Sequence, residues 1–585
     1  MEKDTVLFFS RSSKLKITGS RVVIECLVEQ GVDTVFGYPG GAILNVYDEL
    51  YKNSDRIRHI LTAHEQGASH AADGYARSTG KVGVVFATSG PGATNLVTGI
   101  ATAYMDSSPI VAITCNVPTT LLGKDSFQEI DITGVTMPIT KHNYIVRNVE
   151  ELADVIREAF IIAKSGRPGP VLIDIPKEVT ANEVEFEPLK NADEIAKRIQ
   201  DKNIHLKRSL NPPSPSDEEI KKAAEIINNA KRPVIYAGGG IIIGNASEEL
   251  LALAQTADIP VSESMMARSA FPSSNSLNLG MVGMHGTKAS NMAVTESDLV
   301  LALGSRFSDR VISNPQHFAE NSQVFHIDID AAEINKNIPV SGKLIGNVKD
   351  ILKRLLPLIK KADHSEWKNK IAEWKKDYPK IYDENPADSI NPKFLCECIH
   401  KIAGDDTFIT TEVGEHQLWT AQHYPFEKPR TFVTSGGLGT MGFGTGAAMG
   451  IQFANPKARV VHIAGDGSFR MNCNELATIS HYNLPLVIVV VNNGTLGNVR
   501  LWQKAFYGER YSATTLDFGP DWVKLAAAYG IDGYKANNAA EFEKVFAEAF
   551  KSGKPAVIDA KVDIDVPVLP MVPGGRAIYD QIMDL

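Results

Sequence analysis

Short runs of apolar, often β-branched residues alternate with longer stretches of helical periodicity along most of the chain. The clearest runs cover residues 82–87, 234–236, 299–303 and 460–463. A strand that is apolar on both faces is typical of a parallel sheet covered by helices on both sides. The pattern therefore predicts an α/β fold built from doubly wound parallel sheets.

Two polar stretches interrupt this alternation. The first turns polar near residue 200 and ends in the segment NPPSPS at 211–216, where prolines break regular structure. The second has the pattern of a charged, solvated helix that ends at prolines. The expected division is a tail (1–16), a first domain (17–190), a linker (191–216), a central domain (217–350), a second linker (351–391) and a third domain (392–585).

The first and third domains share an order of segments that the alternation alone does not require. In the first, a strand (82–88) enters SGPGATN, and a helix and a second strand (109–114) follow. In the third, a strand (460–464) enters GDGSF, and a helix and a second strand (485–491) follow. We interpret these as related domains that flank a distinct central one. A chance likeness between two doubly wound domains stays open as the alternative.

Composition narrows the class of protein. With 585 residues, 43% hydrophobic and 22% charged, the chain is long enough for three or four packed domains, which excludes a disordered chain. The net charge of −9 argues against nucleic acid and anionic membranes as partners. No apolar run approaches the ~18 residues that span a bilayer. We therefore expect a protein that handles small molecules.

The cysteines and the N-terminal segment indicate a compartment. The five cysteines are scattered, without a CxxC pair, which fits a reducing cytoplasm better than a disulfide framework or a zinc site. The segment MEKDTVLFFSRSSKLKITGS lacks the long apolar run of a signal peptide. We expect a cytoplasmic protein, and the Arg and Lys residues of this segment leave an organellar leader as the alternative.

The motif Gly465-Asp466-Gly467-Ser468 follows a predicted strand, and Asn493 ends the next one. Both lie where carboxyl ends of parallel strands meet, the edge at which such folds bind ligands. A carboxylate, an amide oxygen, carbonyls and water suit Mg²⁺, which also binds diphosphate oxygens. The glycines let the backbone approach phosphates, and Ser468 can open a helix whose N-terminus faces them. Separately, each segment is better explained as a turn; together, they predict a magnesium and diphosphate site.

The stretch GDGSFRMNCNELATISHYNLPLVIVVVNN resembles the thiamine diphosphate and magnesium motif of thiamine-dependent enzymes. That family places a glutamate beside the aminopyrimidine ring, and HEQGASHAADGYAR supplies Glu65 at the matching position. A carboxyl that shares a proton with ring nitrogen N1′ favours the imino tautomer, which can deprotonate thiazolium C2. Alone, Glu65 would be taken for a solvated or helix-dipole residue. Its place between FGYPGGAI and SGPGATN favours the catalytic role.

More closely, nearly all of the chain after residue 17 resembles the large catalytic subunits of the acetolactate (acetohydroxyacid) synthase family, of the biosynthetic, FAD-containing type. The ordered motifs that carry this likeness are VFGYPGGAIL, HEQGASHAADGYAR, GKDSFQEIDI, ITKHNY, SGRPGPVLIDIPKEVT, GMVGMHGTKASNMAV, LGSRFSDRVI, VFHIDIDAAEINKN, TSGGLGTMGFGTGAAMG, LGNVRLWQ and PMVPGG.

The resemblance implies a thiamine diphosphate-dependent transferase. Such enzymes decarboxylate pyruvate and condense the hydroxyethyl carbanion with a second 2-ketoacid, in valine, leucine and isoleucine biosynthesis. Pyruvate as acceptor gives acetolactate, and 2-ketobutyrate gives acetohydroxybutyrate. One alternative is a related FAD and thiamine diphosphate carboligase or a pyruvate oxidase. Another is a non-catalytic cofactor-binding homologue, which the retention of Glu65, Asp466 and Asn493 disfavours.

The resemblance also assigns residues to the site. It implies catalysis by Glu65, and thiamine diphosphate binding by Gln128, His416, Gly439, Met441, Gly465, Asp466, Gly467, Ser468 and Asn493. The implied Mg²⁺ ligands are Asp466, Asn493 and the carbonyl of Thr495. The implied substrate pocket comprises Gly41, Ala42, Phe127, Lys177, Arg310 and Trp502, in which a guanidinium suits a carboxylate and a broad ring suits a short alkyl group. Packing stays the alternative for Trp502, Phe127 and Met441, and a surface ion pair for Arg310.

In the central domain, AGGG, GMHGTKAS, GSRFSDR and FHIDID resemble the family's FAD-binding segments. The implied FAD-binding residues are Arg167, Gly238, Gly239, His285, Gly286, Thr287, Gly304, Arg306, Asp309, Arg310, Asp328 and Ile329. Glycine turns at strand ends permit contact with a diphosphate, and arginines supply positive charge. The flavin is implied to be structural, because the main reaction has no net redox change.

Several positions depart from the family's pattern. Glu412 and Glu415 stand in TEVGEHQ where the family has TDVGQHQ, Asn498 replaces the usual methionine, Ser308 replaces an aspartate, and Asn347 follows Gly346 where an aspartate is expected. Extra negative charge beside a diphosphate needs compensation. These departures bear on substrate preference and on cofactor and flavin affinity more than on reaction type.

The resemblance further implies partners. The substrates are 2-ketoacids, and the first and third domains would each hold half of the cofactor. The assembly is therefore expected to be a homodimer or tetramer with active sites at subunit interfaces. A small regulatory subunit is implied for the family, although no residue of this chain establishes one.

Overall fold

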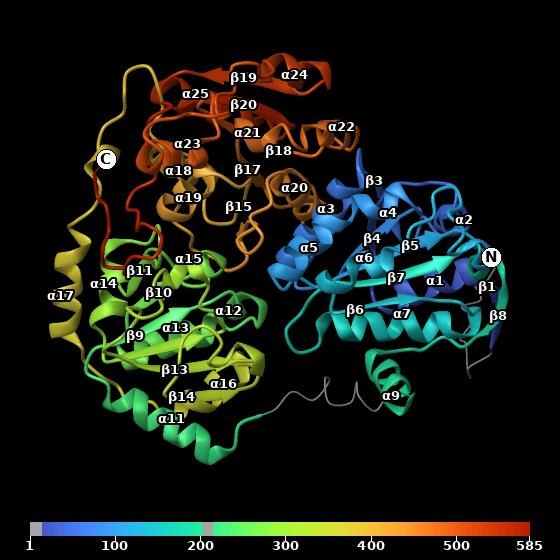
Figure 1. Cartoon of the computed structure of the whole chain (residues 1–585), viewed down its shortest axis with the longest axis horizontal. Coiled ribbons are helices and arrows are strands. Elements are labelled where there is room, and N and C mark those ends of the chain that lie inside the picture. Colours follow the sequence, from blue (N-terminus) through green and yellow to red (C-terminus); the bar gives the residue numbers. More distant parts are fainter. Residues whose placement is uncertain (1–13, 203–213, 585) are drawn as a thin grey trace, which may run out of the picture. The chain divides into compact units, whose positions relative to one another are not determined.

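The computed structural model describes residues 14–202 and 214–584. The chain packs into two compact units, of which the first holds one six-stranded sheet and the second holds two (Figure 1). Neighbouring strands run parallel throughout all three sheets. The predicted α/β class, with three parallel-sheet domains, is confirmed.

The sheet of the first unit has the strand order β3-β2-β4-β5-β7-β6. Its strands are β2 (Thr34–Gly37), β3 (Arg58–Leu61), β4 (Gly83–Ala87), β5 (Ile110–Asn116), β6 (His142–Ile145) and β7 (Val171–Pro176). The principal helices are α1 (Gly19–Glu29), α2 (Leu44–Lys52), α3 (Glu65–Thr79), α5 (Val97–Met105) and α7 (Val149–Lys164). Alternate strand residues, such as Val84 with Phe86 and Val111 with Ile113, join α1 and α7 in one buried cluster. Burial of this face fixes the register of the strands.

The expected tail contributes to the first unit. Leu15 and Lys16 belong to strand β1 (Leu15–Thr18), which pairs antiparallel with β8 (Glu183–Phe186). Residues 1–13 of the expected tail lie outside the described residues. The ordered domain therefore begins before residue 17.

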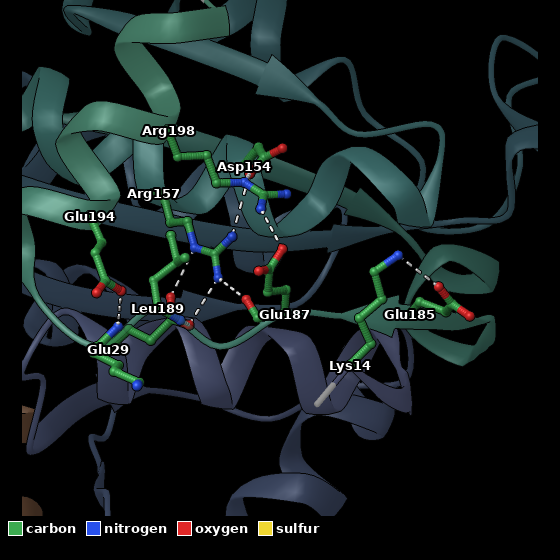
Figure 2. A network of polar contacts seen from close by, with 10 residues as sticks. Lys14, Glu29, Asp154, Arg157, Glu185, Glu187, Leu189, Glu194 and Arg198 are labelled. Carbon is green, nitrogen blue, oxygen red and sulfur yellow. Dashed lines mark hydrogen bonds and ion pairs between the residues drawn. The ribbon is translucent and has the colours of Figure 1, made fainter. Parts of the chain in front are cut away.

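Helix α9 (Ala192–Lys202) lies within the expected linker 191–216 and is bound to the first unit by charged contacts (Figure 2). Arg198 Nε donates to Asp154 Oδ1 at 2.8 Å, and Arg198 Nη1 to Glu187 Oε2 at 3.1 Å. Arg157, buried beneath them, donates from Nε and Nη2 to the two oxygens of Glu29 at 2.8 Å each. The polar composition near residue 200 thus marks a docked helix, and residues 203–213 lie outside the described residues.

The second unit contains the central sheet, with the order β11-β10-β9-β12-β13-β14. Its strands are β9 (Pro233–Ala237), β10 (Val261–Glu263), β11 (Asn278–Met281), β12 (Leu299–Leu303), β13 (Gln323–Asp328) and β14 (Gly342–Ile345). Helices packed around it include α11 (Asp217–Asn229), α12 (Gly240–Ile243), α13 (Ser247–Ala257), α14 (Lys288–Glu296), α15 (Asp309–Ile312) and α16 (Val348–Leu355). Buried clusters on both faces of the sheet explain its apolar strands.

The second expected linker, 351–391, is folded onto the central domain. Helix α16 crosses its first boundary, and helix α17 (Ser365–Lys375) buries Trp367 and Ile371. Trp367 Nε1 donates to the carbonyl of Pro233 at 3.1 Å. The helix is as predicted, but the expectation that it is solvated is wrong for this face, because two apolar residues four apart form a buried stripe among charged neighbours.

The other sheet of the second unit has the order β16-β15-β17-β18-β20-β19. Its strands are β15 (Phe408–Thr411), β16 (Phe432–Val433), β17 (Val460–Gly465), β18 (Leu486–Asn492), β19 (Asp532–Ala536) and β20 (Ala556–Lys561). Its helices include α18 (Pro392–Ala403), α19 (Glu415–His423), α20 (Phe443–Ala454), α21 (Asp466–Phe469), α23 (Gly497–Phe506), α24 (Trp522–Ala528) and α25 (Ala539–Ser552). The central strands β15, β17 and β18 are neighbours, so their carboxyl ends share one edge.

A search of the described helices for membrane spans finds none with the length and hydropathy that a bilayer crossing requires.

Candidate active site

A cavity of about 130 Å³ opens at the carboxyl edge formed by β15, β17 and β18. Its lining contains predicted cofactor and metal residues, namely His416, Met441, Gly465, Asp466, Gly467, Ser468, Asn493 and Thr495. Three neighbouring parallel strands therefore bring together residues that are up to 79 positions apart in the sequence. This is the edge at which a doubly wound sheet binds ligands.

Asp466 supplies a carboxylate to this cavity. Its side chain is 4% exposed, and burial raises its pKa to about 6, against the opposing effect of Arg470. A buried carboxylate is costly unless a cation or hydrogen bonds compensate it. Asp466 thus belongs to a site that favours a bound cation.

Asn493 and Thr495 lie opposite Asp466 on the loop after β18. The Thr495 amide donates to Asn493 Oδ1 at 3.3 Å, and Thr495 Oγ1 donates to the carbonyl of Thr514 at 2.8 Å. These bonds hold the loop against the segment around residue 514. A carboxylate, an amide oxygen and a backbone carbonyl are hard ligands of the kind that Mg²⁺ prefers. In the described parts of the chain, three or more His, Cys, Asp or Glu residues nowhere gather into a metal cluster.

His416 gives the cavity a neutral polar group. Burial lowers the pKa of its imidazole to about 3, and within the described chain its Nε2 has no hydrogen-bond partner. A Cβ at position 465 would lie 2.7 Å from His416 Nδ1, so Gly465 permits this close approach. His416 Nε2 without a partner, the buried Asp466 carboxylate and the cavity-lining backbone of Gly465 together fit a diphosphate bound with Mg²⁺.

The segment that carries Met441 is held at both of its ends. The amide of Thr440 donates to Ser435 Oγ at 3.0 Å, and that of Gly442 donates to Glu412 Oε2 at 2.6 Å. Gly439, with φ of 72°, adopts a left-handed conformation that favours glycine. Met441 lines the cavity, whereas Gly439 supports the turn beside it.

The two glutamates that depart from the family's pattern have different environments. Glu415 lines the cavity and is 6% exposed. Glu412 does not line it; its carboxylate accepts from the amides of Gly442 and Thr445 at the start of α20. The two glutamates therefore differ in direction: the Glu415 side chain lines the cavity, whereas the Glu412 side chain caps a helix.

Arg310 and Trp502 form a pair in the second unit. The guanidinium carbon of Arg310 lies 5.8 Å from the centre of the Trp502 ring, a cation–π geometry. Arg310 Nη1 also donates to Met284 Sδ at 3.6 Å. The alternative ion pair, with Asp309, has a separation of 3.8 Å between strongly exposed side chains and contributes little. The geometry therefore brings a cation and a broad ring together, while their role as an acceptor pocket stays a prediction.

The first unit gathers another group of predicted residues. Glu65, 9% exposed at the start of α3, accepts from Asn95 Nδ2 at 2.9 Å. A Cβ at position 92 would lie 3.2 Å from Glu65 Oε1 and 2.8 Å from Thr88 Cγ2. The amide of Ala42, which follows Gly41, donates to Thr88 Oγ1 at 3.3 Å. Glu65 and Thr88 therefore both lie close to Gly92, and Thr88 also holds the backbone of Ala42.

The loop that follows β5 carries Phe127 and Gln128. Gln128 has φ of 58°, and a Cβ at position 90 would lie 2.8 Å from its Cα. Phe127 is 87% exposed, so it contributes nothing to the core of the first unit. Lys177 begins the short helix α8 (Lys177–Ala181) directly after β7. These positions all follow carboxyl ends of strands.

The predicted FAD residues lie largely at the carboxyl edge of the central sheet. The amide of Gly238 donates to the carbonyl of Leu303 at 2.8 Å, and a Cβ at position 238 would lie 2.1 Å from the carbonyl oxygen of Gly304. Gly239 follows on the same turn, and Arg306, Asp309 and Arg310 follow β12. Asp328 and Ile329 lie at the end of β13. The turns pack so closely that position 238 requires glycine. In addition, the buried Ser305 Oγ has no hydrogen-bond partner among the described residues. The edge therefore fits a nucleotide.

The remaining predicted FAD residues have local partners. Thr287 caps α14 by accepting from the amide of Ser290 at 3.1 Å, and Gly286 precedes it. His285 contacts the carbonyl of Pro570 at 3.2 Å, and burial lowers its pKa to about 4. Arg167 lies in the first unit, where its Nε donates to Ser107 Oγ at 2.7 Å.

The cavity also has lining residues to which the sequence pattern assigns no role: Val413, Gly414, Trp419, Val491, Leu496, Gly497 and Val499. Each flanks a predicted residue at a strand end or helix start. That neighbourhood is the one signal that could have identified them, because apolar and glycine residues carry no distinctive chemistry.

Comparison with known proteins gives three matches in chain order. Residues 17–135 match the model of the N-terminal TPP binding domain of thiamine pyrophosphate (thiamine diphosphate) enzymes. Residues 220–355 match the central domain of these enzymes, and residues 412–560 match their C-terminal TPP binding domain.

Curated relatives match nearly the whole chain. A probable acetolactate synthase large subunit of Methanocaldococcus jannaschii is 48% identical over 570 residues, which cover 95% of this chain and 94% of that protein. An acetolactate synthase of Mycobacterium leprae is 45% identical over 98% of this chain and 92% of its own length. The acetolactate synthase large subunit of Haemophilus influenzae is 41% identical over 97% of this chain and 98% of its own length. The chain belongs to the acetolactate synthase large-subunit family of thiamine pyrophosphate enzymes.

Proposed function

We propose that this chain is the catalytic subunit of an acetolactate synthase in branched-chain amino acid biosynthesis. The enzyme joins two 2-ketoacids with loss of carbon dioxide, so that two pyruvate molecules give acetolactate and carbon dioxide. The observation that carries the proposal is the convergence of Asp466, Asn493 and Thr495 on one cavity at the carboxyl edge of the sheet.

The residues of this edge would hold Mg²⁺ and a diphosphate. Asp466, Asn493 Oδ1 and the carbonyl of Thr495 would supply hard oxygens for the metal, and the backbone of Gly465 and Gly467, which lines the cavity, would contact phosphate oxygens. When bound, thiamine diphosphate supplies a carbon nucleophile that accepts the electrons released on decarboxylation. Met441 would support the ring system from below the cavity.

Glu65 would hold the proton that the pyrimidine ring requires. Asn95 Nδ2 donates to Glu65 Oε2 at 2.9 Å, and Glu65 Oε1 lies 3.2 Å from where a Cβ of residue 92 would be. A glutamate fixed in this way can share a proton with a ring nitrogen without losing its orientation. Gln128, Phe127, Gly41, Ala42 and Lys177 would line the substrate path.

The Arg310–Trp502 pair would bind the acceptor ketoacid. The guanidinium suits the carboxylate of the ketoacid, and the indole face suits its short alkyl chain. Because the pair contacts both parts of the acceptor, it would discriminate between acceptors that differ by one methylene.

We also propose that the central domain binds FAD at its glycine-rich edge, where it would have a structural role. The close turns at Gly238 and Gly304 support this assignment. Because Ser308 and Asn347 depart from the family's pattern and bear on flavin affinity, the flavin content of the purified protein should be measured directly.

The protein would assemble as a homodimer or tetramer, in the cytoplasm, with active sites at subunit interfaces. Helix α23 supports assembly, because Val499, Trp502 and Phe506 are 51%, 42% and 52% exposed on one side of it. An apolar face of this kind at the rim of a site is typical of a protein interface. The relatives named large subunits favour a small regulatory partner as well.

The test is to incubate the purified protein with pyruvate, thiamine diphosphate, Mg²⁺ and FAD and to measure acetolactate. Acetolactate as the main product supports the proposal. Acetaldehyde, or acetyl phosphate formed with peroxide, would instead identify a decarboxylase or an oxidase and overturn it.

A further inference from the structure

Glu415 places a second carboxyl group in the cavity that contains Asp466. It is the first residue of α19, after β15, so Glu415, Asp466 and Asn493 follow three neighbouring strands of one sheet. Both carboxyl groups are more than nine-tenths buried and line the same cavity, and they repel each other electrostatically. Two buried carboxyl groups that repel each other keep both of their charges only when a cation compensates them; otherwise one of them takes up a proton.

A single hydrogen bond joins Glu415 to a predicted ligand of that cation. Asn493 Nδ2 donates to Glu415 Oε2 at 3.0 Å. The amide nitrogen therefore points toward Glu415, and the amide oxygen points away from it. Because the nitrogen and oxygen of an amide are opposite in polarity, this bond, together with the bond from the Thr495 amide to Asn493 Oδ1, sets the orientation of the Asn493 amide.

The local backbone is shaped around this carboxylate. A Cβ at position 497 would lie 1.7 Å from Glu415 Oε2, so the first residue of α23 must be glycine for Glu415 to occupy its place. The positive end of α23 faces the carboxylate, and Arg500 on the same helix adds a favourable charge. Arg500 is also paired with Asp565 at 3.0 Å, which limits this compensation.

Independently, the cavity contains a polar atom that requires a partner. His416 is 5% exposed, and its Nε2 has no hydrogen-bond partner within the described chain. The two carboxyl groups, the Asn493 amide held by Glu415 and the unpartnered His416 Nε2 together indicate a ligand that combines a cation with anionic oxygens.

We propose that Glu415 is a positioning and charge-supplying residue of the cation site: it orients Asn493 and increases the affinity of the site for a divalent cation while opposing the diphosphate. The proposal rests on the proposed function, because it assumes that both groups occupy this cavity. The two effects have opposite signs, since a negative charge attracts the metal and repels phosphate oxygens.

The variant Glu415→Gln tests the charge, because it retains an oxygen that can accept from Asn493 Nδ2. Two affinities are measured: that for Mn²⁺ alone, from the electron paramagnetic resonance signal of free Mn²⁺, and that for thiamine diphosphate at saturating Mg²⁺, from quenching of tryptophan fluorescence. We expect the Mn²⁺ affinity to fall about tenfold and the thiamine diphosphate affinity to rise. An unchanged thiamine diphosphate affinity would overturn the assignment of Glu415 as a group that opposes the diphosphate. A parallel fall of both affinities would indicate a purely structural role and overturn the proposal, as would an unchanged Mn²⁺ affinity.

Two further variants separate charge from geometry. Glu415→Asp retains the charge, so its Mn²⁺ affinity should lie closer to the wild-type value than that of Glu415→Gln; the reverse order would overturn the charge assignment. Glu475→Gln is the matched control, because Glu475 is a buried carboxyl of the same domain that does not line the cavity, and neither affinity should change. A change in the control as large as that in Glu415→Gln would show that the effect is not local and overturn the proposal.

The outcome is distinguishable from failure of the proposed function. If the wild-type protein binds neither Mn²⁺ nor thiamine diphosphate, the proposed function fails together with this inference. If it binds both and Glu415→Gln behaves like the wild type, the inference about Glu415 fails alone.

Discussion

Glu65 is buried and accepts a hydrogen bond from Asn95, so a conservative substitution can test its role at the scale of one residue. Replacing it with Gln preserves the acceptor oxygen for Asn95 but removes the proton that a carboxyl can share. We expect Glu65→Gln to retain thiamine diphosphate affinity and to lose at least about 100-fold in acetolactate formation. Binding is measured by fluorescence quenching and turnover by the product assay. An unimpaired rate would remove the proton-holding role, and loss of binding would indicate a structural one.

Asp174 provides a pH-dependent prediction away from the cavity. Burial raises its pKa from 3.8 to about 6, although Thr114 Oγ1 and Asn116 Nδ2 each donate to it at 2.7 Å. The folded state therefore binds the proton more tightly than the unfolded state, so this group stabilises the fold less as the pH rises from about 4 to about 6. A shift of this size corresponds to about 3 kcal/mol.

The variant Asp174→Asn cannot ionise and so lacks this pH dependence. Relative to the wild type, its free energy of unfolding should improve by about 3 kcal/mol between about pH 4 and about pH 8, as measured by urea denaturation. Asp131→Asn is the control, because hydrogen bonds from the amide of Gly134 and the Thr133 hydroxyl lower the pKa of Asp131. Its pH dependence therefore falls below about pH 4, and its difference from the wild type should stay nearly constant across this range. A constant difference between Asp174→Asn and the wild type across this range would contradict the prediction.

At the same scale, the sequence predicts residue types better than it predicts side-chain directions. Asp466, Asn493 and Thr495 are brought together as expected, because each follows the end of a neighbouring parallel strand. Glu412 and Glu415 are three positions apart and have the same chemistry, yet one caps a helix and the other lines the cavity. Spacing cannot separate them, because the turn between a strand and a helix sets the direction of each side chain.

Helix α20 illustrates how an element depends on one such residue. Glu412 accepts from the amides of Gly442 and Thr445 at 2.6 and 3.1 Å, which satisfies donors at the helix start that would otherwise be buried without partners. We expect Glu412→Ala to lower the free energy of unfolding by about 3 kcal/mol and to weaken thiamine diphosphate binding, because Met441 directly precedes Gly442. Urea denaturation and fluorescence titration measure the two effects.

A conservative variant distinguishes the cap from simple packing. Glu412→Gln keeps one acceptor oxygen, so it should lose less stability than Glu412→Ala. Equal losses in the two variants would mean that side-chain volume, and not hydrogen bonding, supports α20.

Secondary-structure elements are predictable from the sequence where burial produces a local pattern of apolar residues. Strands β4, β9, β12 and β17 follow the apolar runs closely, because both faces of each sheet are covered. The docking of helix α9 on the first unit was not predictable, because charged side chains and not an apolar stripe make its contacts. Arg198 binds Asp154, 44 positions earlier, and no local pattern reveals such a partner.

For the whole molecule, the sequence predicts three domains, and the structure joins the second and third of the sheets into one compact unit. Arg268 is part of the reason: it is paired with Glu263 in the central domain and donates from Nε to the carbonyl of Ala421 on α19 at 2.9 Å. Arg268 and Ala421 are both buried and lie 153 positions apart in the sequence. A division based on composition cannot detect a junction of this kind.

The proposed assembly of active sites between two copies of the chain predicts the activity of mixed dimers. Glu65 belongs to the first unit and Asp466 to the second, so Glu65→Gln and Asp466→Ala each inactivate a different half of the proposed site. In a dimer of one Glu65→Gln chain and one Asp466→Ala chain, sites shared between subunits would include one with both residues intact. Coexpression of the two variants with different tags should then yield about a quarter of the wild-type activity after random pairing, and about half in the isolated mixed dimer. If each site lies within a single chain, every site contains one inactive half, and the mixed dimer has only the residual rate of the separate variants.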